Sequence, residues 1–567
     1  GETVWTYREP HTTRYDRGMR NNYGKGVAYG EVDGRGVIFT SSPAFFLHAL
    51  DAKTGRHLED WGQAVPLGGF PEGGVVDLLP DLVADWSPWL ESGYTYDPDQ
   101  GIPRELGNLS SSSPPIVVNG VIIVSNVHEQ GYYQTRIENI PGDILAYDTR
   151  TGQHLWKFHV IPRPGEFGHD TWENDAWRTT GDVSSWAPMS ADLDRGIVYI
   201  PTNPPTIDFY GGFRPGDNLF GTSLLALDVT TGRRVWHYQL VHHDIWNFDN
   251  PTAPVLLNVT VDGKPKPIVV QTTKQAWAYT FDRETGEPVW AIEERAVPSS
   301  EVPGEHLSPT QPFPTWPLAY DMQGLTESDL IDFTPDLEAQ AQTIARTFLL
   351  GPLFTPPSVV SAEPGGTRGT LALPGSWGSG NWNTGAFDPE TGMYYAVSHV
   401  VPRVYRLADA SGETGTEMAY YSPNRDAPYL DGIPLTKPPW GRITAIDLHR
   451  GEHRWQVANG GGIRDHDALR GLDLRPLGVA SRPVALVTGS FLFLGEGSNV
   501  FGGIQPNMWG PTFRAYDKVT GRVIWQTDLP AGTTGGPMTY FHEGKQFIVV
   551  PIGGTDHSGE WIALALP

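Results

Sequence analysis

The chain has 567 residues and a formal net charge of −25 at neutral pH. This acidic balance disfavours nucleic acid and anionic membranes as partners and favours solubility. The sequence contains no cysteine, which excludes disulfides, thiolate nucleophiles, cysteine-ligated metals and covalently attached c-type haem within this chain. No apolar run approaches the length of a membrane-spanning helix, and no signal peptide is visible.

A short motif recurs along the whole chain. It reads Ala-x-Asp, then Thr-Gly or Gly alone, and then Trp eight residues after the Asp. Clear copies lie at residues 146–156, 226–236, 281–290, 445–455 and 515–525, and weaker copies lie at residues 49–61 and 386–395. The opening residues GETVW match the tail of one more copy, which makes eight copies. Because the chain begins inside a copy, we expect upstream residues, a targeting segment among them, to be absent from this sequence.

The fold of one copy follows from its residue types. Alternating apolar residues such as Ile144 and Ala146 predict a strand that enters a turn at Asp148. The Asp and the Thr-Gly pair close that turn through side-chain-to-backbone hydrogen bonds and a glycine with positive φ. The next strand presents a Trp large enough to pack against the neighbouring unit. A closed ring of such sheets covers every sheet face, so the repeat predicts an all-β, eight-bladed β-propeller with tryptophan-docking motifs, forming one domain over residues 1–567.

The first half of the chain alternates loops with strands. Residues 19–32 read as a loop and a strand, and residues 60–113, rich in Pro, Gly, Ser and Asp, read as a long surface insertion. Asn119-Gly120 predicts a hairpin within residues 117–133, which ends in the polar cluster Asn126, His128 and Glu129. Residues 184–205 predict two strands, with Trp186 before the first and Asn203 after the second.

The second half contains the largest insertion, residues 291–384. Within it, residues 325–350 give the one convincing helical pattern, with Thr334 and Pro335 as a plausible helix start, so we expect one largely helical insertion. Residues 376–389 return the chain to the ring, and the C-terminal MTYFHEGKQFIVVPIGG predicts two more strands.

Several sequence blocks together resemble one known family. The blocks are GVAYGEV after Lys25, TNPP at 202–205, RPGDN at 214–218 and HHDIWNFD at 242–249. With the Trp repeat they resemble the quinoprotein alcohol and glucose dehydrogenases, eight-bladed propellers that use pyrroloquinoline quinone (PQQ) and a divalent or trivalent metal ion. The resemblance covers essentially the whole chain. SPTQPFPTWP at 308–317, FTPPS at 354–358 and GNWNTGAFDPETG at 380–392 are most similar to the membrane glucose dehydrogenase branch.

The resemblance implies a set of cofactor-binding residues. Lys25 matches the basic residue that pairs with a PQQ carboxylate, and Trp186 matches the indole that stacks on the planar quinone. Lys274 matches the cation beside the quinone oxygens, where it could stabilise the reduced cofactor. The other cofactor-lining positions are Asn126, Asn381 and Trp382. A solvated surface Lys and Trp packed in the core remain the structural alternatives.

The same resemblance implies a metal site. Glu129 and Asn203 match two metal-ligand positions, and Asp249 matches the extra ligand of lanthanide-using members. Carboxylate and amide oxygens are the hard ligands that Ca²⁺ or a lanthanide ion prefers. An exposed loop carboxylate and a turn-forming Asn remain the alternatives for Glu129 and Asn203.

Two departures from the family pattern bear on activity. The family's catalytic base is an Asp at the position of Asn247, and an amide has no lone pair basic enough to accept a proton at neutral pH. Asp249, two residues on and facing the same way on strand alternation, could bind the metal or serve as the base. Ala44 stands where the glucose-oxidising branch places a His, and Met19-Arg20 replaces a Cys pair of the alcohol-oxidising branch. Residues 242–244 are interpreted as packing and hydrogen-bonding residues of the blade.

Three functional hypotheses remain open. The first is a periplasmic or secreted PQQ- and metal-dependent dehydrogenase that oxidises an alcohol or sugar-like hydroxyl, with Asp249, Asn247 and Lys274 in the catalytic site. Its electrons would pass to a separate acceptor, a cytochrome c or a quinone. The second is a propeller that has lost the redox base and performs a non-redox reaction. The third is a propeller that only binds a ligand.

Overall fold

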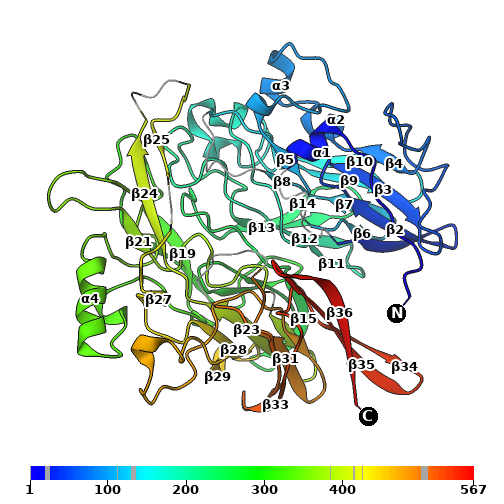
Figure 1. The fold of residues 1–567 in the computed structure, drawn as a ribbon. Coiled ribbons are helices and arrows are strands. Elements are labelled where there is room, and N and C mark those ends of the chain that lie inside the picture. Colours follow the sequence, from blue (N-terminus) through cyan, green and yellow to red (C-terminus); the bar gives the residue numbers. More distant parts are fainter. Residues whose placement is uncertain are drawn as a thin grey trace. The chain divides into compact units, whose positions relative to one another are not determined.

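The computed structural model describes residues 2–18, 26–111, 113–128, 136–383, 385–410, 412, 415–423, 426–499 and 508–566. These residues form mainly antiparallel sheets (Figure 1). They divide into two compact units, the first made of residues 1–254, 299–311 and 408–422, and the second of residues 255–298, 312–407 and 423–567. Each unit is described by itself.

The first unit contains three four-stranded sheets. The strand orders are β1 (Ala28–Val32), β2 (Arg35–Ser41), β3 (Phe46–Asp51), β4 (Val75–Asp77); β6 (Ile116–Val118), β7 (Val121–Val124), β9 (Ile144–Asp148), β10 (His154–Phe158); and β11 (Ser190–Asp192), β12 (Ile197–Pro201), β13 (Ser223–Asp228), β14 (Arg234–Gln239). In each of these sheets, strands that are neighbours in the order given are hydrogen-bonded to each other. Outside these sheets are the pair β5 (Leu109–Ser110) and β8 (Val127–His128), the helices α1 (Thr13–Arg17), α2 (Leu79–Val83) and α3 (Ser87–Glu91), and the 3₁₀ segments Arg104–Leu106, His169–Thr171 and Glu173–Arg178.

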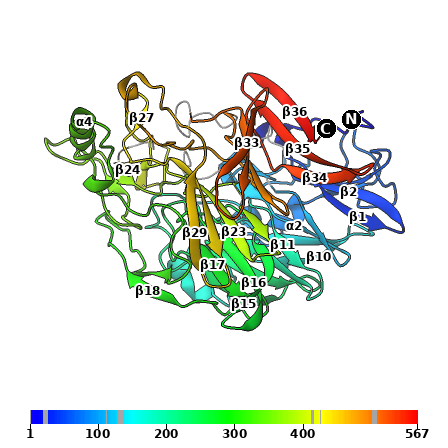
Figure 2. The ribbon, with the colours of Figure 1, turned by 90° about the horizontal axis from the view of Figure 1, so that it is seen from below.

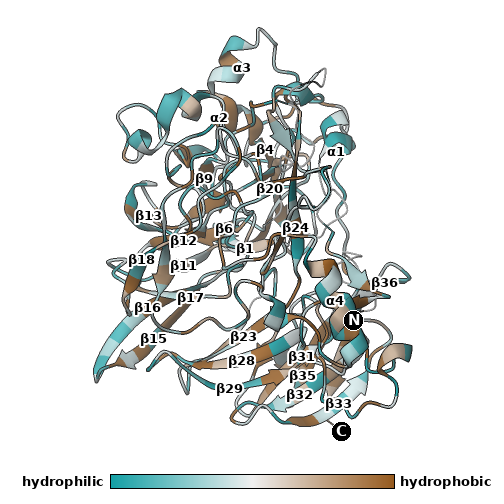
Figure 3. Ribbon diagram, turned by 90° about the vertical axis from the view of Figure 1, so that its left-hand side faces the viewer, coloured by the Kyte–Doolittle hydropathy of each residue, from teal (hydrophilic) through white to brown (hydrophobic). Residues whose placement is uncertain are grey.

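The second unit is built in the same way (Figure 2). Its sheets are β15 (Val255–Val261), β16 (Lys264–Thr272), β17 (Ala278–Asp282); β22 (Ala386–Asp388), β23 (Met393–His399), β28 (Gly441–Asp447), β29 (Glu452–Ala458); β30 (Leu486–Val487), β31 (Phe491–Gly495), β32 (Thr512–Asp517), β33 (Val523–Asp528); and β34 (Met538–His542), β35 (Lys545–Gly554), β36 (His557–Ala565). Shorter elements of this unit are β18 (Ile292–Ala296), β20 (Ser358–Val359), β21 (Thr370–Ala372), β26 (Tyr429–Leu430), β27 (Ile433–Pro434), α4 (Pro335–Ala345) and the 3₁₀ segments Glu327–Asp329 and Asp467–Leu469. Strand β25 (Tyr420–Tyr421) belongs to the first unit, and β19 (Thr310–Pro314) and β24 (Arg403–Asp409) each have residues in both ranges. Along β16 the side chains pass from exposed Lys264 to buried Thr272. Figure 3 colours each strand by the hydropathy of its residues, from teal for hydrophilic to brown for hydrophobic.

The repeat motif folds as its residue types predict. Asp148 Oδ1 accepts hydrogen bonds from Thr151 N at 2.8 Å and Thr151 Oγ1 at 2.9 Å, and Gly152 has φ +72°. The indole N–H groups of Trp5, Trp61, Trp156 and Trp455 donate to the carbonyl oxygens of Ala52, Thr149, Val229 and Lys518 at 2.9–3.3 Å. At Gly232 (φ +67°) a Cβ would lie 2.5 Å from the Trp156 ring, so the turn glycine leaves space for the tryptophan of the preceding repeat. In these four copies the motif therefore docks its tryptophan onto the turn of the next repeat.

Other local predictions are confirmed. The hairpin at Asn119-Gly120 has φ +48° and +83° and pairs Val118 with Val121. Helix α4 begins where expected, because the Thr334 side chain accepts the N–H of Leu337 and Pro335 fills the first turn. It covers only Pro335–Ala345, so the expectation of a largely helical insertion over residues 291–384 is not confirmed. Strands β34 and β35 lie in the C-terminal segment that predicted them.

Residues 60–113 are only partly a surface insertion. Strand β4 completes the first sheet by pairing with β3, and Trp86 is fully buried. Composition alone hid this, because the Pro- and Gly-rich loops surround a short apolar run from Val75 to Val83 that packs in the core.

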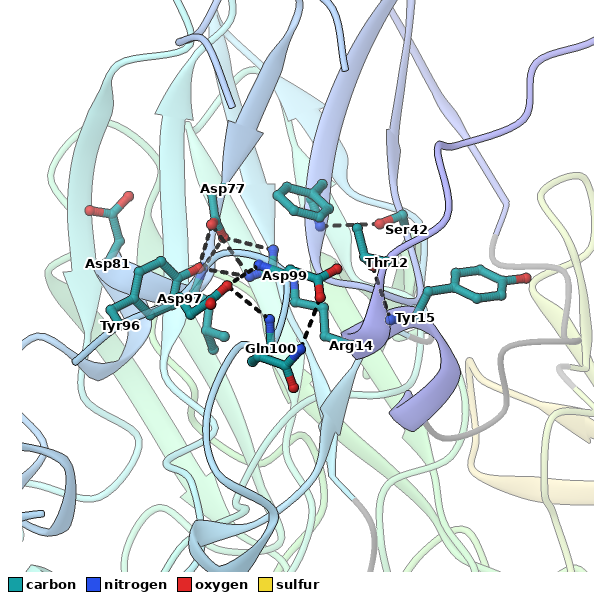
Figure 4. A network of polar contacts seen from close by, with 12 residues as sticks. Thr12, Arg14, Tyr15, Ser42, Asp77, Asp81, Tyr96, Asp97, Asp99 and Gln100 are labelled. Carbon is teal, nitrogen blue, oxygen red and sulfur yellow. Dashed lines mark hydrogen bonds and ion pairs between the residues drawn. The ribbon is translucent and has the colours of Figure 1, made fainter. Parts of the chain in front are cut away.

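Helix α1 is fastened to this segment by a buried ion pair (Figure 4). Arg14 Nη2 lies 2.8 Å from Asp77 Oδ1, and Arg14 Nη1 donates to the Tyr96 hydroxyl at 2.7 Å. Tyr96 in turn donates to Asp77. The Arg14 guanidinium also lies 3.8 Å from the Phe46 ring centroid.

Candidate functional site

The loop HHDIWNFD follows β14 and is shaped by the Asp244 carboxylate. Asp244 Oδ1 accepts Trp246 N at 2.8 Å, and its Oδ2 accepts Phe248 N at 3.0 Å and Thr222 Oγ1 at 2.8 Å. His243 and Asn247 have φ of +45° and +60°. The carboxylate thus holds a tight loop whose later residues, Asn247 and Asp249, are buried.

Trp186 and Asp249 are in direct contact. The Trp186 indole Nε1 donates to Asp249 Oδ2 at 2.9 Å, and both residues are at most 5% exposed. Ser113 donates its hydroxyl hydrogen to the Trp186 carbonyl oxygen. The structure therefore brings together the predicted stacking residue and one predicted metal ligand.

Asn203 lies on the segment that follows β12 and presents an unsatisfied oxygen. Its backbone N–H donates to Ser184 O at 2.8 Å, and its Nδ2 donates to Ser184 Oγ at 3.0 Å. Its Oδ1 is buried and has no hydrogen-bond partner among the described residues. A buried oxygen without a donor is costly unless an ion or water binds it. Through these bonds to Ser184, two residues before Trp186, Asn203 is joined to the segment that carries Trp186.

Asn247 contacts a carboxylate that the sequence analysis missed. Its Nδ2 donates to Asp208 Oδ2 at 3.0 Å, and both side chains belong to residues that are 3% exposed. The segment carrying Asp208 is fixed to the loop because Phe209 N donates to Ile245 O at 2.9 Å. The available signal was a lone Asp in the apolar sequence TIDFY, five residues after Asn203.

Several charged groups surround this loop. Arg214 is fully buried and donates to Asp244 O at 2.7 Å and to Asn218 Oδ1 at 2.8 Å. Burial lowers the pKa of Arg214, while Glu305, Asp244 and Asp208 act in the opposite direction. Burial, with a smaller contribution from the Asp249 charge, raises the pKa of Asp244 to about 6.

His243 is a packing residue, as its interpretation predicted. Its Nδ1 donates to Gly216 O at 2.7 Å and its Nε2 lies 2.9 Å from Glu305 Oε1. Burial tends to raise the pKa of Glu305, but the contact with His243 and further donors hold it below its ordinary value. This pair anchors residues 299–311 beside the loop.

Lys274 and residues 376–383 form a second group, in the other unit. Lys274 follows β16, is 2% exposed, and accepts Ser379 N on its carbonyl oxygen at 2.8 Å. At Gly378 (φ +73°) a Cβ would lie 2.4 Å from Lys274 Cγ, so the turn can pack on this lysine only with glycine there. Asn381 donates to Trp377 O at 3.0 Å and accepts from Arg482 Nη1 at 3.3 Å, and Trp382 is half-buried.

Of the remaining predicted residues, some lie in the described part of the chain and others lie outside it. Asn126 donates to Asp143 O at 3.1 Å, so its Oδ1 accepts from His128 Nε2 at 2.8 Å. Burial lowers the pKa of His128 to about 3, which leaves that imidazole neutral. Lys25 and Glu129, like Met19-Arg20, lie outside the described residues. Ala44 packs in an apolar cluster with Phe46 and Val75.

Comparison with known proteins identifies the family. Residues 1–548 match the family model described as PQQ, glucose/ethanol/alcohol dehydrogenase, beta-propeller domain. The chain belongs to this family. It is therefore a PQQ-dependent quinoprotein dehydrogenase of the alcohol- and sugar-oxidising kind, with a propeller fold that is mainly β. The number of blades, eight, remains a prediction.

Its relatives are longer proteins. The glycerol dehydrogenase large subunit of Gluconobacter oxydans (strain 621H) is 31% identical over 92% of this chain and 68% of its own length. The quinoprotein glucose dehydrogenase of Escherichia coli (strain K12) is 30% identical over 81% of this chain and 58% of its own length. Among solved structures, the quinohemoprotein alcohol dehydrogenase from Comamonas testosteroni aligns over all of this chain and 70% of its own, at 20% identity and a TM-score of 0.62, which shows a shared fold. Within the described residues, no helix is long and apolar enough to cross a membrane.

Proposed function

We propose that this quinoprotein oxidises an alcohol or sugar-like hydroxyl with PQQ and a metal ion, and passes the electrons to a separate cytochrome c or quinone, in the periplasm or outside the cell. The observation that carries the proposal is the cluster of Trp186, Asp249 and Asn203. A stacking indole there is bonded to a carboxylate, and a buried amide oxygen nearby lacks a donor. This is the donor set that a cofactor and a hard cation require.

The metal site would use oxygen ligands of this cluster. Asn203 Oδ1 and the Asp249 carboxylate would bind the ion, with Glu129 as the third ligand that the family pattern supplies. Ca²⁺ and a lanthanide are both candidates, and a europium-containing methanol dehydrogenase shares this fold with a TM-score of 0.60 at 19% identity. The buried Asn203 oxygen fits either ion, because both prefer hard oxygen donors.

The cofactor would be held by aromatic and cationic residues. Trp186 would stack on its ring, Lys25 would pair with a carboxylate, and Lys274 would stabilise negative charge on its oxygens. The further cofactor-lining residues are Asn126, Asn381 and Trp382. When bound, PQQ supplies the redox chemistry by accepting a hydride, and the protein's task is to orient the hydroxyl and accept its proton.

A titration tests this proposal. Metal-free protein is titrated with PQQ in the presence of Ca²⁺ or La³⁺ while its absorbance is followed, and glycerol, glucose and quinate are then screened for dye reduction. We expect stoichiometric binding and dye reduction by at least one substrate. Lys274→Met should weaken PQQ binding, whereas Lys264→Met, at the exposed start of β16, the strand that precedes Lys274, should not. Absence of PQQ binding with either metal would contradict the proposal.

A second candidate follows from Asn247. With an amide at the family's base position, the chain could have lost oxidation and retained a non-redox reaction or ligand binding alone. Turnover of a substrate without any electron acceptor would favour the non-redox enzyme. PQQ binding without dye reduction by any substrate would favour the binding protein.

A further inference from the structure

We propose that Asp208 is the general base of this dehydrogenase and replaces the carboxylate that Asn247 lacks. This inference rests on the proposed function and on the match of Asn247 to the family's base position. The carrying observation is the contact between Asn247 Nδ2 and Asp208 Oδ2 at 3.0 Å. A carboxylate thus lies one hydrogen bond from the position where the proton is removed.

The position of Asp208 is built into the fold. The backbone bond from Phe209 N to Ile245 O, 2.9 Å long, joins its segment to the HHDIWNFD loop. Asp208 and Asn247 are both 3% exposed, so their hydrogen bond is shielded from competing water.

A buried arginine lies within electrostatic reach of Asp208. Arg214, on the same segment, is close enough for the Asp208 charge to affect its guanidinium. Asp244 and Asp249 on the loop, and Glu305 beside His243, are the other charged groups around this arginine and loop. The buried cation offsets the cost of keeping a carboxylate ionised, and an ionised carboxylate is what a base requires.

Asp249 is less suited to the same task. Its Oδ2 already accepts the Trp186 indole N–H, and it is the candidate metal ligand. A bound cation stabilises the ionised form of a carboxylate and so weakens it as a base. The two carboxylates therefore have different roles: Asp249 binds the metal ion, and Asp208 accepts the proton of the substrate hydroxyl.

The reaction balances with these parts. The substrate O–H bond breaks, and its proton moves to a carboxylate oxygen of Asp208. PQQ, when bound, would take the hydrogen of the same carbon with its electron pair, which leaves the alcohol as a carbonyl compound. Reoxidation of the cofactor by the separate acceptor would remove the two electrons and release the proton that came with the hydride, and Asp208 would give its own proton to water.

Exchange of the two side chains tests the inference in the PQQ- and metal-loaded enzyme. Asp208→Asn should lower kcat by roughly 10²–10⁴-fold while PQQ affinity stays unchanged, and the acid limb of the pH profile should disappear. The double variant Asp208→Asn/Asn247→Asp keeps the charge and the hydrogen bond, and it should recover most of the lost rate. Asp217→Asn, an exposed carboxylate of the same segment, is the matched control and should behave as wild type.

A second readout uses the cofactor-free protein. Thermal unfolding of Asp208→Ala, Asn247→Ala and the double variant gives the loss of stability in each. The loss in the double variant should be smaller than the sum of the two single losses, because each single variant already breaks the same hydrogen bond. Additive losses, or an Asp208→Asn enzyme with wild-type kcat, would overturn the role of Asp208. Failure of wild-type protein to bind PQQ would instead overturn the proposed function, while the coupling would still be measurable.

Discussion

Two buried polar clusters of the first unit differ in how their charges are balanced. In the Arg14 cluster (Figure 4), one guanidinium faces one carboxylate, and Tyr96 bonds to both. In the HHDIWNFD cluster, Asp208, Asp244 and Glu305 act on one buried arginine, Arg214, and Asp249 acts on Asp244. Nearby, Asn203 Oδ1 has no donor among the described residues. The first cluster pairs its guanidinium with one carboxylate, whereas the second places several carboxylates around one guanidinium.

This difference separates a structural cluster from a binding cluster. A closed ion pair fixes one arrangement of the chain and gains nothing from a ligand. Surplus carboxylates and an unpaired amide oxygen are costly in the free protein, and a cation removes that cost when it binds. The contribution of the second cluster to the unfolding free energy should therefore depend on pH and on bound metal, and the contribution of the first cluster should not.

The largest effect is expected on breaking the Arg14 cluster. Asp77→Ala would leave the Arg14 guanidinium buried without its carboxylate, which should cost about 3 kcal/mol of unfolding free energy. Chemical denaturation measures this loss, and PQQ binding should stay unchanged in the variant that remains folded. Arg35→Met breaks a solvent-screened pair with Asp51 (3.7 Å) and should cost far less. Equal costs for the two variants would contradict the assigned role of burial.

The second cluster should make stability depend on pH through Asp244. Its pKa is raised from 3.8 to about 6 in the folded protein, so the folded state binds this proton more tightly than the unfolded state. The resulting stabilisation is present below pH 4 and is lost as pH rises through 6, a change of about 3 kcal/mol. The difference in unfolding free energy between wild type and Asp244→Asn, measured across this range without metal, should show that decline. A difference that stays constant with pH would show that folding does not shift the pKa of Asp244.

Metal binding should stabilise the second cluster through Asn203. At a concentration of Ca²⁺ or La³⁺ near 100 times the Kd, the metal should add about 2.7 kcal/mol to the unfolding free energy. Asn203→Ala should remove most of this increment, because it deletes the buried Oδ1 acceptor. The exposed Asn258→Ala serves as the control and should retain it. An unchanged increment in Asn203→Ala would exclude Asn203 as a ligand.

Sequence reasoning predicted the repeat well because its signals are local. Asp148, Gly152 and Trp156 lie within nine residues, and each acts through its own turn or the adjacent repeat. Through the resemblance to a family pattern, the same reasoning named Trp186 and Asp249, which the structure brings into contact, while their roles and that of Asn203 stay predictions. It treated Val75–Val83 as surface because burial of a short apolar run depends on distant strands.

Asp208 shows the limit of that reasoning. It and Asn247 are 39 residues apart in the sequence and meet only because two loops converge. No spacing rule predicts such a contact, since the register between loops is set by bonds such as Phe209 N to Ile245 O. The site's residue types were therefore readable from the sequence, but their pairings were not.

The smallest effect is expected from removing one hydroxyl group in each cluster. Tyr96→Phe leaves the Arg14–Asp77 pair intact and should cost about 1 kcal/mol at every pH from 5 to 8. Thr222→Val removes a donor to Asp244 and should raise the pKa of that carboxyl further, because the lost bond lowers it. Its cost should therefore be small below pH 4, where Asp244 is protonated, and should grow to about 1 kcal/mol or more above pH 6. Denaturation curves of both variants at pH 4 and 7.5 measure the contrast. If the losses of unfolding free energy in the two variants change with pH in the same way, the carboxylates of the two clusters do not titrate differently. The proposed pH dependence of the HHDIWNFD cluster would then be wrong.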